Sequence, residues 1–253
     1  MRKVFGILSL CWKVYIGIIF LITALFFYPI IFPFLFSLEN KKRSFRIFVV
    51  WSWTVRIFCG YFVRKEHKIT PPKGPYLIVA NHISYLDIFL MYSILPNHPF
   101  LFLGKSEILR YPLIKTYFKR LNIPVYRENR LKAAKSLIHA SREVKNGWGL
   151  VIFPEGKIPD ENPQMARFKG GAFQLAKNLA IPIVPLTFLN NHLLFSDPTL
   201  LLGPARPGVS RVYMHAHITP EEIKRMTQDE LAKHCQQIIE APLLKEYPEL
   251  KSN

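Results

Sequence analysis

An uncharged apolar stretch near the N-terminus constrains this chain more than any other feature. No residue between Lys13 and Glu39 is charged, so residues 14–38 form an uncharged run of 25 residues. A helix of that length would cross a hydrocarbon core of roughly 30 Å at about 1.5 Å per residue. Pro29 complicates this prediction, because the Pro-free residues 14–28 would reach only about 22 Å as a straight helix.

An earlier helix start removes the difficulty. A helix that begins near Val4 would be long enough to cross if Lys13 extends its ammonium group to the membrane surface. A secretory signal peptide is the alternative, with Arg2 and Lys3 as its basic start. The apolar run is too long for a signal peptide, and no Ala-x-Ala-like cleavage site follows it. We therefore expect a retained membrane segment.

A second, aromatic segment follows over residues 45–63, interrupted by Arg46 and Arg56. Its uncharged runs are too short to span a membrane, whereas amphipathic rings settle at the headgroup boundary. The rings in question are those of Trp51, Trp53, Phe58, Tyr61 and Phe62. A buried core helix is the alternative for this segment. Together the two segments predict a helical hairpin that dips into or crosses the bilayer, and basic residues at both ends predict cytoplasmic flanks.

Net charge and hydrophobicity point to the same kind of partner. The formal net charge is +17, and half of the residues are hydrophobic. An anionic membrane surface satisfies both properties, whereas nucleic acid satisfies only the first, and disorder is excluded by the apolar content. Cys11, Cys59 and Cys235 are far apart and form no CxxC pair, so we expect neither a disulfide framework nor a zinc site.

The remainder predicts an α/β domain. Residues 71–75, PPKGP, break the chain and divide it into an N-terminal part, residues 1–70, and residues 71–253. Short apolar runs predict strands over residues 76–80, 99–103, 123–126, 149–153, 182–188 and 211–217. Amphipathic runs predict helices over residues 84–95, 131–145, 167–179 and 227–241. This alternation predicts a mixed, largely buried sheet flanked by helices.

Polar clusters follow two of the predicted strands. The active sites of α/β proteins usually lie in the loops at the carboxyl ends of strands. Asn81 to Asp87 follow the first strand, and Pro154 to Lys157 follow the fourth. His82 and Asp87 can meet if the histidine lies in the turn and the aspartate lies in the first turn of the helix. The carboxylate would then hold one imidazole nitrogen and leave the other as a base. In the alternative interpretation, His82 caps the helix and Asp87 is solvated.

These motifs resemble those of the glycerolipid acyltransferase family, which includes 1-acylglycerol-3-phosphate acyltransferases. Asn81-His82-x4-Asp87 is similar to the first family motif, and Phe153-Pro154-Glu155-Gly156 is similar to the third. Three weaker matches are Lys105-Ser106-Glu107, a strand over residues 123–127 that ends in Arg, and the Pro-containing strand over residues 181–185. The resemblance covers roughly residues 74–188 and implies an acyltransferase domain over residues 71–253.

Two positions depart from the family pattern. Family members commonly read Glu-Gly-Thr-Arg-Ser in the third motif, whereas this chain reads Glu155-Gly156-Lys157-Ile158-Pro159. Lys157 could replace the missing arginine as a point charge, and Arg167 or Lys169 could also serve. Asn122 replaces a common glycine before the second-motif strand. These departures leave the identity of the acceptor lipid open.

The resemblance implies a direct acyl transfer from a thioester to a lysophospholipid hydroxyl. His82 would be the general base, and Asp87 would fix its tautomer. Lys105 and Arg127 would hold an acceptor phosphate, and Glu155 would order one of these cations or the glycerol.

Asn81, Gly156 and Lys157 complete the expected substrate-binding residues, with turn amides near Gly156 as oxyanion donors. Solvated surface charge is the alternative for Lys105, Arg127 and Lys157. No Gly-x-Ser-x-Gly elbow occurs, which disfavours an acyl-enzyme.

We expect no bound cofactor and no metal, with acyl-CoA or acyl carrier protein as the acyl donor. The expected location is the membrane, with the catalytic domain on the cytoplasmic face. The expected acceptor is 1-acylglycerol-3-phosphate, and another lysolipid, such as a lyso-aminolipid, is the first alternative. A non-enzymatic basic binder of membrane or nucleic acid is the second, although it leaves the paired motifs unexplained.

Overall fold

The computed structural model describes residues 2–36, 40–67, 69–126 and 128–252. At its centre is a seven-stranded sheet of order β1-β7-β6-β2-β5-β3-β4. Neighbouring strands run parallel except β6 and β7, which are antiparallel. The strands are β1 (Tyr61–His67), β2 (Leu77–Ala80), β3 (Phe100–Lys105), β4 (Ile123–Val125), β5 (Gly149–Ile152), β6 (Ile183–Phe188) and β7 (Gly208–Met214). The prediction of a mixed, largely buried sheet is confirmed, since every residue of β2 and β6 is buried.

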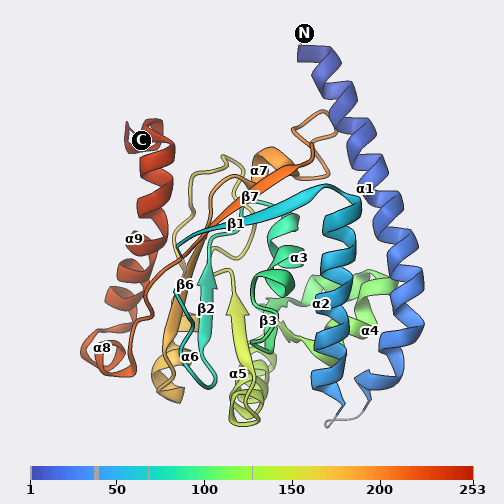
Figure 1. The fold of residues 1–253 in the computed structure, drawn as a ribbon. Coiled ribbons are helices and arrows are strands. Elements are labelled where there is room, and N and C mark those ends of the chain that lie inside the picture. Colours follow the sequence, from blue (N-terminus) through green and yellow to red (C-terminus); the bar gives the residue numbers. More distant parts are fainter. Residues whose placement is uncertain (1, 37–39, 68, 127, 253) are drawn as a thin grey trace.

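Helices cover both faces of this sheet (Figure 1). On one side lie α2 (Lys41–Phe58), α3 (Tyr85–Ile94) and α4 (Pro112–Leu121), with α1 (Arg2–Ile31) outside them. On the other lie α5 (Arg130–Lys145), α6 (Gly171–Leu179), α8 (Pro220–Arg225) and α9 (Gln228–Glu246). The remaining elements are α7 (Asn191–Leu194) and the 3-10 turns η1 (Phe32–Leu35), η2 (Ser106–Arg110) and η3 (Pro248–Ser252). Because β2, β5, β3 and β4 are parallel neighbours, their carboxyl ends meet at one edge of the sheet.

The N-terminal hairpin forms as expected, but Lys13 is used differently. Helix α1 starts at Arg2 and keeps Pro29 inside it, and it is long and apolar enough to cross a membrane by length and composition. The ammonium group of Lys13 does not extend away from the protein. It donates to Ser196 Oγ at 2.9 Å and to the Leu200 carbonyl at 2.5 Å, in the loop between α7 and β7. Helix α1 is therefore attached to the α/β part at this point.

The second segment was predicted wrongly at its end. Helix α2 stops at Phe58, and Tyr61 to Val63 belong to strand β1, which pairs with β7. Gly60 makes the change of direction with a φ of +57°, a value that favours glycine. The expected aromatic belt is split, because Trp51 and Tyr61 are buried, whereas Trp53, Phe58 and Phe62 are exposed.

One hydrophobic core runs through both parts of the chain. Phe27 of α1 and Phe45 of α2 belong to the same cluster as Leu77 of β2 and Phe100 of β3. The Trp51 indole N–H also donates to Thr23 Oγ1 at 3.0 Å, which ties α2 to α1. The break at residues 71–75 is thus a boundary of composition, and packing continues across it.

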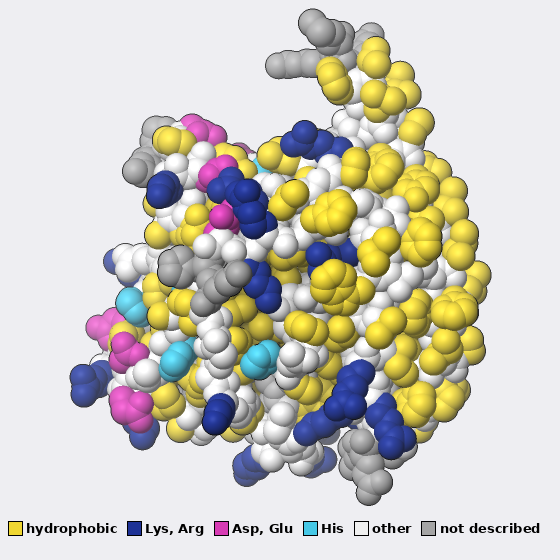
Figure 2. Space-filling model, in the orientation of Figure 1, with side chains coloured by type: hydrophobic (Ala, Val, Ile, Leu, Met, Phe, Trp, Pro, Cys, Tyr) yellow, Lys and Arg dark blue, Asp and Glu magenta, His cyan; other side chains and the backbone are white. Residues whose placement is uncertain are grey.

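Apolar side chains nevertheless cover the outer surface of α1. Figure 2 shows this hydrophobic face on the right of the molecule, with basic side chains near its lower end. Its exposed members include Ile18, Leu21, Ile22, Leu25 and Phe26. A patch of this kind on a protein surface indicates a partner that is itself apolar.

Three of the predicted elements have a boundary at least three residues from the one expected. Strand β7 starts at Gly208 and ends at Met214, and α6 starts only at Gly171. Helix α9 continues to Glu246 with Pro242 inside it. The residues before α6 form a loop rather than a helix, because the Ala166 backbone N–H is bound to the carboxylate of Glu155 and the Lys169 N–H to the Pro154 carbonyl.

Candidate active site

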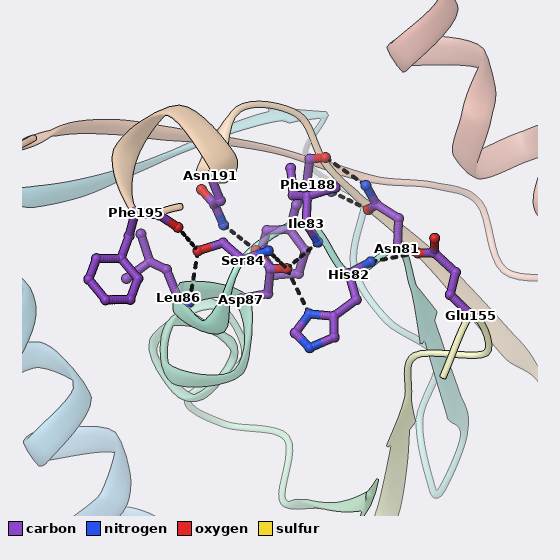
Figure 3. A network of polar contacts seen from close by, with 10 residues as sticks. All are labelled: Asn81, His82, Ile83, Ser84, Leu86, Asp87, Glu155, Phe188, Asn191 and Phe195. Atoms are coloured by element: carbon purple, nitrogen blue, oxygen red, sulfur yellow. Dashed lines mark hydrogen bonds and ion pairs between the residues drawn. The ribbon is translucent and has the colours of Figure 1, made fainter. Parts of the chain in front are cut away.

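The turn after β2 is built around a helix cap. Ser84 is the N-cap of α3, and its Oγ accepts from the Leu86 backbone N–H at 3.1 Å. Asp87 completes the capping box, because its Oδ2 accepts the Ser84 backbone N–H at 2.9 Å. Such reciprocal caps satisfy amides that the helix leaves unpaired. The cap fixes the carboxylate of Asp87 beneath the turn that carries His82 (Figure 3).

His82 and Asp87 meet within this turn. The imidazole Nδ1 lies 3.0 Å from Asp87 Oδ2, and the same oxygen accepts the Ile83 backbone N–H at 2.8 Å. Asp87 has no exposed surface, so the interpretation in which it is solvated is wrong. An ionised carboxylate can only accept, so Nδ1 carries the proton and Nε2 of the neutral ring keeps its lone pair. The pair therefore has the geometry of an oriented base.

Aromatic neighbours fix the plane of this ring. The Phe153 ring stacks on the imidazole with centroids 4.2 Å apart and an interplanar angle of 19°. The Tyr85 ring meets it edge-on at 6.5 Å. Because Phe153 follows β5 and Tyr85 begins α3, the imidazole is held between two elements and its side chain is only 11% exposed.

Glu155 supports the turn rather than ordering a cation or the glycerol. Its Oε1 accepts the His82 backbone N–H at 2.7 Å, and its Oε2 accepts the Ala166 N–H at 2.8 Å. The side chain is almost wholly buried. Burial raises the pKa of Glu155 to about 7, although the two backbone N–H donors lower it in part. The expected substrate contact is therefore corrected to a positioning contact.

Asn81 has a similar supporting role. Its Nδ2 donates to the Phe188 carbonyl at 2.9 Å, and its Oδ1 accepts the Phe188 N–H at 2.8 Å. Asn81 has no exposed surface, so its amide joins the end of β2 to the end of β6. This placement corrects the expectation that Asn81 contacts substrate.

The third motif also differs from the expectation. The Gly156 N–H donates to the Phe153 carbonyl at 3.0 Å in a turn where Gly156 has a φ of +84°. That amide is engaged in the turn, which argues against it as an oxyanion donor. Lys157 places its Nζ 2.6 Å from Asp160 Oδ2 in an exposed pair. Exposed pairs of this kind contribute little free energy, so Asp160 holds Lys157 only loosely.

The other expected cations are distributed along the same edge of the sheet. Lys105 is the last residue of β3 and is partly exposed, two strands from the β2 end that carries His82. Two strand spacings correspond to about 10 Å. Arg127 lies outside the described residues. Arg167 and Lys169 are exposed in the loop before α6.

The contacts of Asn122 give a structural reason for an asparagine where the family commonly has glycine. Its Oδ1 accepts the Phe102 backbone N–H at 2.9 Å, and the residue is buried. Asn122 follows the last residue of α4, so the amide side chain connects that helix end to strand β3. The replacement thus has a structural function beside the site.

Asn191 is a further residue of the site that was not predicted from the sequence. Its Nδ2 donates to Asp87 Oδ1 at 2.7 Å, and both residues have no exposed surface. Asn191 begins α7, just after β6, and no motif marks it. A buried carboxylate needs a donor for each oxygen, and this need was the one signal that a further polar partner existed.

An apolar cavity of about 620 Å³ opens beside the turn. Tyr85, which touches the His82 ring, is also one of its lining residues. Helices α1 to α4 supply most of the walls, including Phe20, Trp51, Phe89 and Tyr117. Within the described residues, no group of three or more His, Cys, Asp or Glu side chains could hold a metal ion.

Comparisons with known proteins point to one family. The family model named Acyltransferase matches residues 61–189. The 1-acyl-sn-glycerol-3-phosphate acyltransferase of Chlamydomonas reinhardtii is 24% identical over 96% of this chain and 70% of its own length. The acl-1 protein of Caenorhabditis elegans is 30% identical over 83% of this chain and 77% of its own. The crystal structure of the acyltransferase PlsC from Thermotoga maritima has the same fold, with a TM-score of 0.73 at 20% identity, covering 100% and 99% of the two chains.

A mixed sheet with a buried His–Asp pair at its carboxyl edge, beside an apolar cavity, is the framework of a lipid-modifying enzyme. The chain belongs to the acyltransferase family. The resemblance drawn from the Asn-His-x4-Asp and Phe-Pro-Glu-Gly motifs is confirmed.

The raised pKa of Glu155 predicts how stability depends on pH. The folded protein keeps a proton on Glu155 up to about pH 7, whereas the unfolded chain releases it near the ordinary pKa of 4.5. This contribution to stability is therefore present below about pH 4.5 and is lost as the pH rises to about 7. The difference in free energy of unfolding between wild type and Glu155→Gln should fall by about 1.4 kcal/mol per pH unit in that window. Denaturant titrations in micelles measure it, and a constant difference would contradict the assignment.

Asn191 should act on the reaction through Asp87. Asn191→Leu removes a hydrogen bond to a charged group, so activity should fall about 10-fold or more. An Asp87 carboxylate that lacks this donor holds the His82 imidazolium more strongly. The acid limb of the pH profile of kcat/KM should therefore move to higher pH. Asn190→Ala is the matched control, since Asn190 contacts β7 and not Asp87. A loss of activity without a shifted profile would mean that Asn191 only stabilises the fold.

Proposed function

We propose that this protein transfers an acyl chain from an acyl thioester to the free hydroxyl of 1-acyl-sn-glycerol-3-phosphate, which yields phosphatidic acid. The observation that carries the proposal is the buried His82–Asp87 pair, whose ring contacts Tyr85 at the wall of the apolar cavity. The names of the matched relatives support this acceptor.

The pair accounts for the chemistry. Nε2 of His82 takes the proton of the lipid hydroxyl while its oxygen attacks the thioester carbonyl carbon. The tetrahedral intermediate then collapses, the carbon–sulfur bond breaks, and the imidazolium returns the proton to the departing thiolate. Asp87 stabilises the imidazolium between these two steps. A positioned base of this kind contributes typically 10²–10⁴-fold to the rate.

The cavity accounts for the acyl chain. Its walls are mainly aliphatic and aromatic, as a site that buries a hydrocarbon chain requires. Since Tyr85 and Leu86 of the catalytic turn line it, a chain inside the cavity would leave its carbonyl carbon near His82. Lys105 and Arg127 remain the candidates for the acceptor phosphate.

A second acceptor class follows from one observation. The third motif lacks the family arginine, and the ammonium of Lys157 lies against Asp160. A lysine offers a phosphate monoester a point charge without the bidentate fork of an arginine. Another lysolipid, such as a lyso-aminolipid, is therefore the alternative acceptor.

We further propose that the hairpin lies in one membrane leaflet on the cytoplasmic face and does not cross the bilayer. Helix α1 is about 45 Å long, and the protein contacts this segment at two places along its length. In the N-terminal half of α1, Lys13 binds the loop at Ser196. Beyond the C-terminal end of α1, the Arg120 guanidinium of α4 lies 4.8 Å from the centre of the Phe36 ring. A crossing hairpin would carry Arg120 into the hydrocarbon core, which is costly.

Replacing the proposed base tests the chemistry. His82→Ala should lower the rate of acyl transfer by about 10²–10⁴-fold because it removes the positioned base that takes the hydroxyl proton. Asp87→Asn should lose much of the rate as well, and the two losses should not add. The assay offers a labelled acyl thioester with 1-acylglycerol-3-phosphate or a lyso-aminolipid, and mass spectrometry identifies the products.

His217→Ala, which changes an exposed histidine, is the control and should keep wild-type activity. If His82→Ala retains a tenth of the wild-type rate, base catalysis by His82 is wrong. Faster product formation from the lyso-aminolipid would select the alternative acceptor.

Labelling of single cysteines tests the membrane arrangement. In a Cys11→Ser background, Phe36→Cys marks the hairpin tip and Lys233→Cys marks α9 on the α/β part, with Cys59 and Cys235 buried. An impermeant thiol reagent should reach both positions from the same side of oriented vesicles. Salt at 1 M should not release the protein, because apolar burial is not screened.

Labelling of the two positions from opposite sides would show that the hairpin crosses the bilayer. Release of the protein by salt alone would show that charge, and not the apolar face of α1, attaches it to the membrane.

A further inference from the structure

A second hollow, of about 380 Å³, lies between the end of β4 and helix α5. Its lining residues are Pro124, Tyr126, Lys132, Lys135, Ser136 and His139. The four residues from α5 are spaced by three and four positions, so they share one face of the helix. Neither the proposed reaction nor the sequence motifs assign a function to this hollow.

The hollow is cationic. The ammonium of Lys132 lies 5.4 Å from the centre of the Tyr126 ring, and neither Lys132 nor Lys135 forms an ion pair with another described residue. One carboxylate, that of Glu143, lies next to the hollow. Its Oε1 is 3.2 Å from His139 Nε2. That oxygen also lies 2.8 Å from the ammonium of Lys41, which compensates its charge.

The position of the hollow matters as much as its charge. Tyr126 follows β4 at the same sheet edge as His82, and the order β2-β5-β3-β4 separates the two strand ends by three spacings. Three spacings correspond to roughly 15 Å. An anion in the hollow is thus at the reacting edge but far from the reacting atoms.

This distance distinguishes the two substrates. In 1-acylglycerol-3-phosphate, the phosphate is on the carbon beside the attacking hydroxyl, so it must bind close to His82. In the acyl donor, a long pantetheine arm separates the thioester sulfur from the phosphate. A donor with its acyl chain in the apolar cavity and its carbonyl at His82 could extend that arm along the sheet edge to α5.

We propose that the hollow binds the phosphate at the end of the donor's pantetheine arm, with Lys132 and Lys135 as its partners. The inference rests on the proposed acyl transfer and adds the place where the donor is held. The same phosphate is present in acyl-CoA and on acyl carrier protein, so the hollow serves either source.

Kinetics with three donors of one acyl chain test the proposal: acyl-CoA, acyl-phosphopantetheine and acyl-pantetheine, which has no phosphate. In the double variant Lys132→Ala/Lys135→Ala, KM should rise about 10-fold or more for the first two donors. KM for acyl-pantetheine and for the lysolipid should not change, nor should kcat at saturating donor. The matched control, Arg142→Ala/Lys145→Ala, removes the same charge from exposed positions of α5 outside the hollow.

Equal losses with all three donors, no loss with any of them, or an equal loss in the control would overturn the proposal. Calorimetry of CoA binding gives a second readout that needs no turnover, and Kd should rise by the same factor as KM. If the wild type acylates no lysolipid, the proposed function fails, and the CoA titration still decides on the hollow. Acyl carrier protein as a fourth donor then shows which source presents the phosphate.

Discussion

The buried carboxylate of Asp87 determines how the active-site edge is assembled. Its two oxygens receive hydrogen bonds from the turn amides of Ile83 and Ser84, from the His82 ring and from Asn191. A charge without exposed surface is costly unless each lone pair finds a donor. These donors come from the turn after β2 and from α7 after β6. The pairing of β2 with β6 is therefore a condition for an oriented histidine.

The residues of the two motifs have two kinds of role: one acts in the reaction, and the others hold the turn in place. In the first motif, His82 uses its Nδ1 on Asp87 and keeps its other ring nitrogen, Nε2, for the reaction. Glu155 holds the His82 backbone, and Asn81 holds Phe188. Glu155 and Asn81 are both buried, and their side chains form hydrogen bonds with backbone groups. A turn fixed from both neighbouring strands keeps the imidazole in one place, which is what a general base needs.

The sequence predicted the parts of this protein that depend on local pattern. Alternating apolar runs located six of the seven strands, and the spacing of His82 and Asp87 indicated their contact. Strand β1 was missed because Tyr61 and Phe62 continue the aromatic composition of α2, and only pairing with β7 makes them a strand. Asn191 was missed for a related reason. Its contact with Asp87 spans 104 residues and follows from sheet order, which no local pattern encodes.

The two sides of helix α1 face different surroundings. Its outer side exposes apolar residues, whereas its inner side, from Leu10 to Tyr28, lines the cavity beside the catalytic turn. One helix, about 10 Å thick, thus separates the exposed apolar surface from the cavity. A chain without α1 would expose Trp51 and Phe89 to water and lose one cavity wall. The exposed apolar surface and the wall of the cavity therefore depend on the same helix, and Lys13 holds it in place through Ser196.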